Sequence, residues 1–279
     1  MAISVGAGSR ARWPGAVLVA AVLLAAALTT WILTIERMRG MDAGPGTDLG
    51  ALGWFLGVWV TMMAAMMFPS AAPMAVVVSR VSGERRRGGP GALATTTTFV
   101  AGYLAVWTAY GLAVYGVYRA VAAADPALLA WDRQGPLVAG AAVAAAGAYE
   151  LTPLKRACLR HCRSPLSFVL HHWRKGRTGG FLMGLEHGAW CLGCCVGLMV
   201  VLVVLGVMSI TWMAVVAAII FAEKVLPGGQ RTTVAVAVCL IGIGAWIVSA
   251  PDSVPGLTEP GGMEMPMDPA MDGSRPMAG

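Results

Sequence analysis

The stretch Gly180–Val207, GFLMGLEHGAWCLGCCVGLMVVLVVLGV, decides the fold class of this chain. It is longer than the roughly 18–20 apolar residues that are needed to cross the hydrocarbon core of a bilayer. Its one formally charged side chain is Glu186, beside His187. A run of this length and hydropathy predicts a transmembrane helix.

The rest of the chain has a similar composition. Of its 279 residues, 57% are hydrophobic and only 12% are charged, and the mean hydropathy is +0.71. Soluble domains usually carry about 25% charged residues, so the composition excludes a mainly soluble protein. The sequence therefore predicts an all-α, polytopic transmembrane helix bundle.

We predict about seven spans, each centred on an apolar run. They cover residues 16–35, 49–78, 93–118, 136–151, 180–207, 209–226 and 232–249. The bundle as a whole occupies 16–250, after a cytoplasmic N-terminal segment at 1–15. A Pro-, Gly- and Met-rich tail at 251–279 has no apolar period, which predicts disorder. The first span lacks a small-residue cleavage site before Trp31, so we expect it to be retained as a helix.

The basic residues predict the orientation of the bundle. The net charge of +6 is concentrated in short loops between the apolar runs, chiefly 79–92 and 152–178. Loops of this kind face the cytoplasm, where they contact anionic lipid headgroups. We therefore expect a multi-pass protein of the cell (inner) membrane, with a cytoplasmic N-terminus and an extracytoplasmic tail. Membrane lipids, and not nucleic acid, account for the positive charge.

The span that opened this section also carries the clearest candidate metal site. His187, Cys191 and Cys195 are spaced by four and Cys194 lies three beyond Cys191, so they share one helix face. Thiolate ligands select Cu(I), zinc or iron–sulfur clusters. A buried cysteine is commonly only a small hydrophobe, but ionisable residues such as Glu186 and His187 are costly within a membrane and usually serve a function. The pattern predicts metal binding by all five residues.

A glycine ladder runs beside this stripe. Gly180, Gly184 and Gly188 recur every four residues. Small residues at this spacing allow a second helix to approach closely. We therefore expect a tightly packed neighbour on the glycine face.

Four methionines fall within six residues of the second span. Met62 and Met66, like Met63 and Met67, are one helical turn apart, so two adjacent rows carry thioethers. Methionine is a flexible core filler, which is the alternative interpretation. Beside a Cys/His stripe, these four side chains are also candidate soft donors that face the metal.

A third group lies in the basic 152–178 loop. Cys158 and Cys162 are one turn apart and His161 is adjacent, among basic residues that favour thiolate. The pattern predicts an accessory cytoplasmic site where metal enters or leaves. The alternative is an amphipathic interfacial helix whose basic residues meet headgroups.

Two carboxylates lie at the predicted cytoplasmic ends of spans. We expect Glu150 and Glu223 to pair with the basic loop. Lys224, next to Glu223, is long enough to extend towards the membrane interface.

Four segments resemble a bacterial family of predicted metal-binding integral membrane proteins, long catalogued as a domain of unknown function. The resemblance covers about 49–246. The segments are Met62–Pro73 (MMAAMMFPSAAP), Leu151–Leu166 (LTPLKRACLRHCRSPL), Gly184–Cys195 (GLEHGAWCLGCC) and Glu223–Gly228 (EKVLPG). The resemblance implies a multi-pass bundle with a metal site, copper being the favoured metal. It also implies that some relatives are subunits of membrane-bound copper-dependent oxidases.

The leading functional hypothesis is a membrane protein that binds copper and handles it, delivers it or holds it within a complex. Zinc is the alternative metal. The expected partner is a companion subunit or a copper-receiving protein. The alternative function is a subunit of a copper-dependent oxidase that acts on a small phenolic or lipid-soluble substrate. A transporter and an inert bundle remain open at this point.

Overall fold

The computed structural model describes residues 14–39, 49–86, 90–124, 134–206, 209–226 and 229–253. Within these ranges all regular structure is helical, which confirms the all-α prediction. The predictions for the N-terminal segment before residue 14 and for the Met-rich tail after residue 253 lie outside the described residues.

Each of the seven predicted spans falls on a helix of the structure, and two short helices occupy the basic loop. The helices are α1 (Pro14–Met38), α2 (Leu52–Arg86), α3 (Pro90–Ala124), α4 (Gly135–Glu150), α5 (Pro153–Arg163), α6 (Pro165–His172), α7 (Gly176–Gly206), α8 (Ile210–Val225) and α9 (Gly229–Ser249), followed by the short 3-10 turn η2 (Pro251–Ser253).

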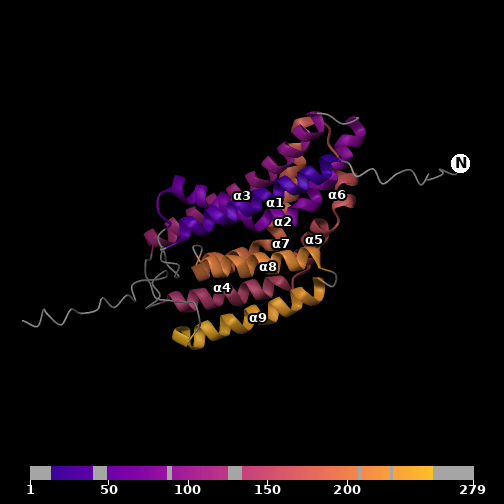
Figure 1. Cartoon of the computed structure of the whole chain (residues 1–279). Helices are drawn as coiled ribbons and strands as arrows, with labels where there is room; N and C mark the ends of the chain where they lie inside the picture. The colour runs from indigo at the N-terminus through magenta and orange to yellow at the C-terminus, as the bar shows by residue number, and fades with distance from the viewer. Residues whose placement is uncertain are drawn as a thin grey trace, which may run out of the picture.

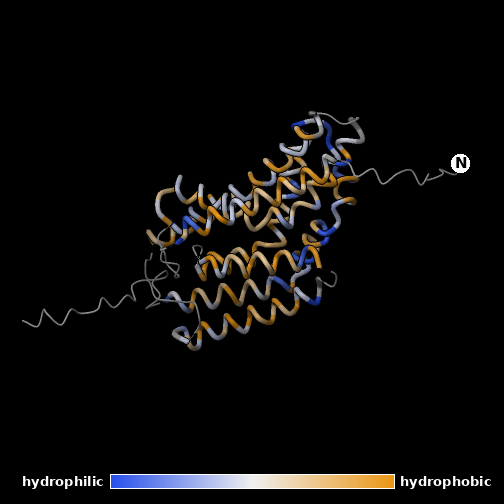
Figure 2. The backbone as a smooth tube through the Cα atoms, viewed as in Figure 1, coloured by the Kyte–Doolittle hydropathy of each residue, from blue (hydrophilic) through white to orange (hydrophobic). Residues whose placement is uncertain are grey.

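Several of these helices are suited to a membrane. Five of the described helices, α1, α2, α3, α7 and α9, are long and apolar enough to cross one, and α4 with α5 makes a sixth if the bent pair is counted as one span. The remaining predicted span, α8, has 16 residues. Hydrophobic residues run along the helices, whereas hydrophilic ones gather at the end of the bundle where α5 lies (Figure 2). The fold is compatible with membrane insertion.

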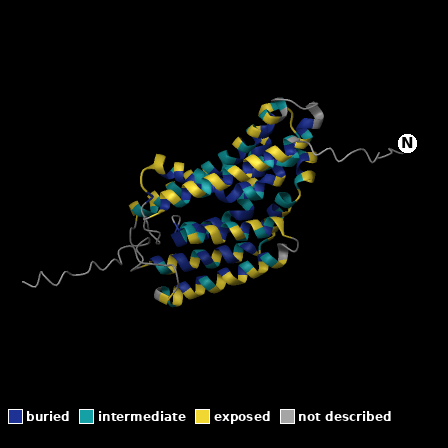
Figure 3. Cartoon of the chain, in the orientation of Figure 1, coloured by how far each residue is buried: buried dark blue, intermediate teal, exposed yellow. Residues whose placement is uncertain are grey.

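The helices form two groups with α7 between them (Figure 1). On one side α1 packs on α2 and α2 on α3; on the other, α4 packs on α9 and α9 on α8. The central helix contacts α3 of the first group and both α4 and α8 of the second. Buried residues line these contacts, and the outward faces of the helices are exposed (Figure 3). The centre of the molecule is therefore the face of α7 that carries the cysteines.

The predicted glycine ladder packs against α3. A Cβ atom at Gly184 would collide with the backbone carbonyl of Phe99, and one at Gly180 would lie 2.5 Å from the carbonyl oxygen of Thr95. At Gly188 it would lie 2.9 Å from a side-chain carbon of α3. The prediction of a closely packed neighbour is confirmed, and that neighbour is α3.

A sharp corner separates α4 from α5. The two helix axes are bent by 64° across the break at residues 151–152. Thr152 caps α5 by accepting a hydrogen bond from the backbone N–H of Lys155 at 3.2 Å, and Pro153 occupies the first helical position. Both are favoured residues for starting a helix. The corner lays α5 against α7 and α8.

A group of buried charges holds this corner in place, and we call it the carboxylate–lysine cluster. The ammonium of Lys155 lies 2.5 Å from an oxygen of Glu150 and 2.8 Å from one of Glu223. All three side chains are at most 2% exposed. The expected pairing of both carboxylates with the basic loop is confirmed, and one lysine of α5 binds α4 and α8 together.

Candidate metal centre

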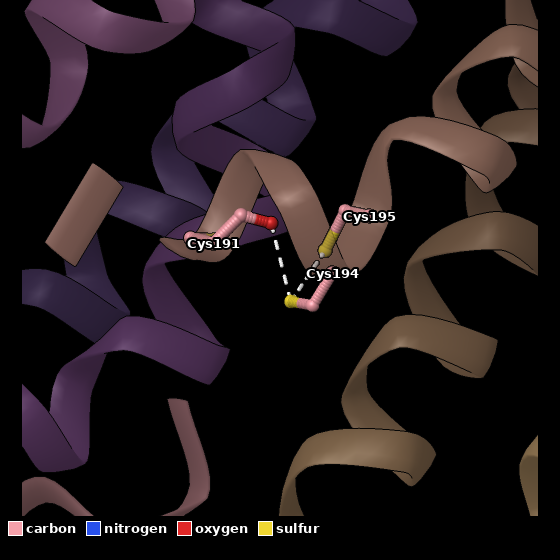
Figure 4. Close-up of side chains that lie close together, drawn as sticks. All are labelled: Cys191, Cys194 and Cys195. Carbon is pink, nitrogen blue, oxygen red and sulfur yellow. Dashed lines mark hydrogen bonds between the residues drawn. The ribbon is translucent and has the colours of Figure 1, made fainter. Parts of the chain in front are cut away.

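Three thiols meet on one turn of α7. The Sγ atoms of Cys191, Cys194 and Cys195 all lie within 4.8 Å of one another, and the side chains are about 1% exposed. The Sγ atoms of Cys194 and Cys195 are 3.5 Å apart, and the Cys194 thiol donates a hydrogen bond to the backbone carbonyl of Cys191 at 3.1 Å (Figure 4). The helical spacing in the sequence therefore produces a compact group of soft donor atoms.

A fourth thiol reaches this group from α5. The Sγ atom of Cys162 lies 3.6 Å from that of Cys194, and the residue is only half-buried. The sequence pattern placed Cys162 in an accessory site; the bend after α4 folds α5 back onto α7 and brings this thiol to the cysteines of α7. We call Cys162, Cys191, Cys194 and Cys195 the thiol cluster.

The two other residues of the predicted accessory site pack on α7 beside the thiol cluster. A Cβ atom at Gly193 would lie 2.7 Å from the Sγ atom of Cys158, so this thiol rests on bare backbone of α7. The His161 ring stacks on Trp190, with centroids 4.1 Å apart and planes within 3°. Both contacts fix α5 against the helix that carries the other cysteines.

Lys224 supplies a positive charge to the thiol cluster. Its Nζ atom lies 3.0 Å from the Sγ atom of Cys191 and 3.4 Å from the hydroxyl of Ser70 on α2. The expectation that this side chain extends to the interface is wrong, since a buried sulfur offers a closer partner. An ammonium at this distance stabilises a negatively charged sulfur. A lysine in the apolar α8 sequence was the signal for such a role.

Aromatic rings enclose the predicted ligand His187. It is 3% exposed and stacks between Phe99 and Tyr103, with ring centroids 5.8 and 5.7 Å away. Within the described part of the chain its Nδ1 atom has no hydrogen-bond partner. The Tyr103 hydroxyl lies 3.1 Å from the sulfur of Cys191, so Tyr103 connects the imidazole to the thiol cluster.

The methionine rows are buried in the same core as the thiols. Met62, Met63, Met66 and Met67 are at most 2% exposed and belong to the apolar cluster that includes the three cysteines of α7. The contact between Ser70 and Lys224 brings the following turn of α2 close to the cysteines.

Glu186 is directed elsewhere. An oxygen of its carboxylate lies 3.2 Å from Nε2 of His172, and both side chains are about one-third exposed. The Glu186 side chain therefore points away from the buried thiols, although Glu186 lies on the same helix as they do.

The comparison with known families agrees with this chemistry. The model of a family described as "PpoB2: Copper chaperone" matches residues 56–247, which is most of the chain. The chain belongs to the PpoB2 copper chaperone family. The match runs from α2 to α9 and contains the whole thiol cluster together with Lys224. No curated protein and no solved structure matches the chain. Copper handling is therefore supported both by the family and by the donor atoms.

Proposed function

We propose that this chain is a membrane-embedded Cu(I) chaperone that holds copper on the thiol cluster. The observation that carries the proposal is the convergence of three buried thiols within 4.8 Å, joined by Cys162 at 3.6 Å. Soft thiolate donors select Cu(I) over the hard cations. The PpoB2 family match supports copper as the cargo.

Charge balance favours Cu(I) over zinc. Two thiolates on Cu(I) carry one net negative charge, which the single ammonium of Lys224, 3.0 Å from Cys191, would offset. Four thiolates on Zn²⁺ carry two negative charges, and the other lysine at this end of the bundle, Lys155, already pairs with two carboxylates. Uncompensated buried charge is costly, so the surroundings suit the monovalent ion.

Further soft donors surround the thiols. We assign His187 the role of a reserve ligand, because its buried ring carries an unpartnered Nδ1 and lies one turn before Cys191. The buried methionines of α2, Met62, Met63, Met66 and Met67, would provide thioethers within the same apolar core as the thiols. Such weaker ligands allow copper to change partners without entering water.

Copper delivery requires a receiving protein, and the PpoB2 family description supports that role. We place the chain in the cell membrane, with α5 and α6 facing the cytoplasm, because their basic residues follow the positive-inside rule. An oxidase subunit is less well supported. Oxygen-activating copper usually needs several imidazoles at one ion, whereas four thiols dominate this centre.

The decisive experiment measures metal content. The protein is purified in detergent from copper-supplemented cells, and copper and zinc are quantified by mass spectrometry. We expect near-stoichiometric copper in the wild type and its loss in Cys191→Ala/Cys194→Ala. Cys239→Ala is the matched control, because this thiol is exposed on α9. Unchanged copper in the double variant, or zinc in place of copper, would contradict the proposal.

A further inference from the structure

A pocket with a volume of about 1210 Å³ lies where the corner between α4 and α5 meets the start of α9. Pockets for small molecules usually measure about 300–1,000 Å³, so this one has room for a larger ligand. No cysteine of the thiol cluster lines it, and it is therefore distinct from the metal centre. Four arginines do line it, and we call it the arginine pocket: Arg156, Arg160 and Arg163 from α5, and Arg231 from α9.

The arginines reach the pocket from two distant segments of the chain. Arg156, Arg160 and Arg163 are four and three residues apart, so they share one face of α5. Arg231 lies in the first turn of α9 and lines the same space. Gathering like charges around one pocket is unfavourable unless an anion offsets their repulsion. The arrangement therefore favours a negatively charged ligand.

The protein itself supplies little of that negative charge. Glu150 is the one acid among the described residues that line the pocket, and one of its carboxylate oxygens lies 2.5 Å from the ammonium of Lys155. The ion pairs found in the described part of the chain are formed by Lys155 and His172, and none includes an arginine. The positive charge of the arginine pocket is thus available to a ligand.

One of the four arginines is held in place by α8. The two terminal nitrogens of Arg163 donate hydrogen bonds to the backbone carbonyl oxygens of Glu223, at 2.8 Å, and Leu226, at 2.7 Å. The other three arginines are exposed. A guanidinium can donate two parallel hydrogen bonds to a phosphate, so these three side chains are suited to a phosphate group.

The position of the pocket favours a lipid over a soluble phosphate. It lies at the hydrophilic end of the bundle (Figure 2), at the start of α9, which is long and apolar enough to cross a membrane. Its wall also contains exposed apolar side chains, since Leu151 is 46% exposed and Val234 is 48% exposed. A phospholipid would cover these side chains with its acyl chains, whereas a free phosphate or an acidic peptide would leave them in water. Basic pockets between membrane helices on the cytoplasmic side bind anionic headgroups in this way.

We propose that the arginine pocket is a specific binding site for one anionic phospholipid, whose phosphate contacts the guanidiniums and whose acyl chains lie along α9. The inference goes beyond the proposed function: it requires the membrane insertion but no copper. The headgroup would contact α5 and α9 at once, and would therefore tie the corner helix to a membrane span.

Native mass spectrometry of the full chain in detergent tests this site. Phosphatidylglycerol and phosphatidylcholine with identical acyl chains are titrated separately, and the dissociation constant of the first bound lipid is measured. The variant is Arg156→Gln/Arg231→Gln, because both side chains are exposed and their replacement spares the core. Arg174→Gln/Arg177→Gln is the matched control, since it removes the same charge from exposed positions of the basic 152–178 segment and its start of α7, outside the pocket.

We expect the wild type and the control to bind phosphatidylglycerol about tenfold more tightly than phosphatidylcholine, or by ~1.4 kcal/mol. The Arg156→Gln/Arg231→Gln variant should bind the two lipids equally. An equal loss of preference in the control would overturn the site, because net charge alone would then explain the binding.

Competition identifies the source of the anion. Displacement of phosphatidylglycerol by an equal concentration of inorganic phosphate would indicate a soluble phosphate site, and displacement by a glutamate-rich peptide would indicate an acidic protein partner; either result would overturn the lipid proposal. Copper content is measured on the same samples. A wild type that holds copper but shows no lipid preference would overturn this inference and leave the chaperone proposal standing, whereas a lipid preference without copper would do the reverse.

Discussion

The carboxylate–lysine cluster and the thiol cluster lie at the same end of the bundle, and both hold polar groups away from water. In the first, one ammonium is shared between two carboxylates at 2.5 and 2.8 Å. In the second, four thiols gather beside one ammonium, at 3.0 Å from Cys191. The first joins α4, α5 and α8, and the second joins α5, α7 and α8.

The difference lies in the donor atoms. Two hard carboxylates share one lysine, so the ammonium is the cation that this cluster binds, and the cluster serves the fold. The sulfur–sulfur contacts of the thiol cluster, at 3.5 and 3.6 Å, are weak hydrogen bonds, and Lys224 beside Cys191 is its cationic partner. Soft sulfur donors grouped in this way are suited to a soft cation that arrives later. Buried polar groups can therefore be sorted into structural and ligand-binding roles by the kind of donor atom and by the cation already beside it.

The largest expected effect is on the structural side of this comparison. Lys155→Met leaves two buried carboxylates without their cation, which should lower the free energy of unfolding by about 3–5 kcal/mol. Chemical denaturation in detergent, followed by circular dichroism, measures the change. Glu150→Gln/Lys155→Met/Glu223→Gln removes all the charges together and should recover most of the loss. A wild-type denaturation midpoint for Lys155→Met would show that the cluster contributes nothing to stability.

The next largest effect is the stabilisation of the folded protein by copper bound to the thiol cluster. Bound copper should stabilise the folded protein by about 2.7 kcal/mol when free Cu(I) is held at a hundredfold excess over its dissociation constant. Thermal unfolding with and without buffered Cu(I) measures this. Lys155→Met should keep the copper-dependent increment although its starting stability is lower, whereas Cys191→Ala/Cys194→Ala should lose it. An increment that survives in the cysteine variant would place copper elsewhere.

A smaller effect is expected on Cu(I) affinity when the ammonium of Lys224 beside the thiols is removed. Lys224→Met should weaken Cu(I) binding by about tenfold, or ~1.4 kcal/mol, because the anionic copper–thiolate group loses its counter-ion. Lys224→Arg keeps the charge and should retain most of the affinity. Competition with a Cu(I) chelator provides the measurement, with the exposed Lys175→Met as control. Equal affinities for the Met and Arg variants would exclude an electrostatic role.

The smallest effect concerns the contact between α5 and α7. Gly193→Ala places a methyl group 2.7 Å from the Cys158 sulfur and should cost about 1 kcal/mol of stability, since α5 must shift. Gly242→Ala on α9 is the matched control, because nothing lies within 4 Å of its added carbon. Comparing the denaturation midpoints of the two variants shows whether the contact between α5 and α7 is strained by the added methyl group. Ala favours a helix over Gly at both positions, so a midpoint for Gly193→Ala no lower than that of Gly242→Ala would show that α5 accepts the methyl group without strain.

The sequence was most informative where structure is local. The apolar runs predicted the helices, and the spacing of Cys191, Cys194 and Cys195 predicted their convergence, because three and four residues make one turn. The glycine ladder predicted a close neighbour for the same reason, although it did not identify α3.

Contacts between distant segments were not predictable in this way. Cys162 precedes Cys194 by 32 residues, and only the 64° bend after α4 brings them together. Lys224 is 33 residues from Cys191, and the rotation of α8 decides whether it points at lipid or at sulfur.

The glycine face of α7 has a mechanical consequence. At Gly184 not even a methyl group fits between α7 and the backbone of α3, so these two helices behave as one rigid wall. The opposite wall of the thiol cluster is α5, a helix of 11 residues that begins at a corner and carries the half-buried Cys162. Any widening that admits an ion must therefore occur on the α5 side. Once the ion is bound to Cys162 and Cys194, it would cross-link α5 to α7 and hold the shorter helix against the rigid α3–α7 pair.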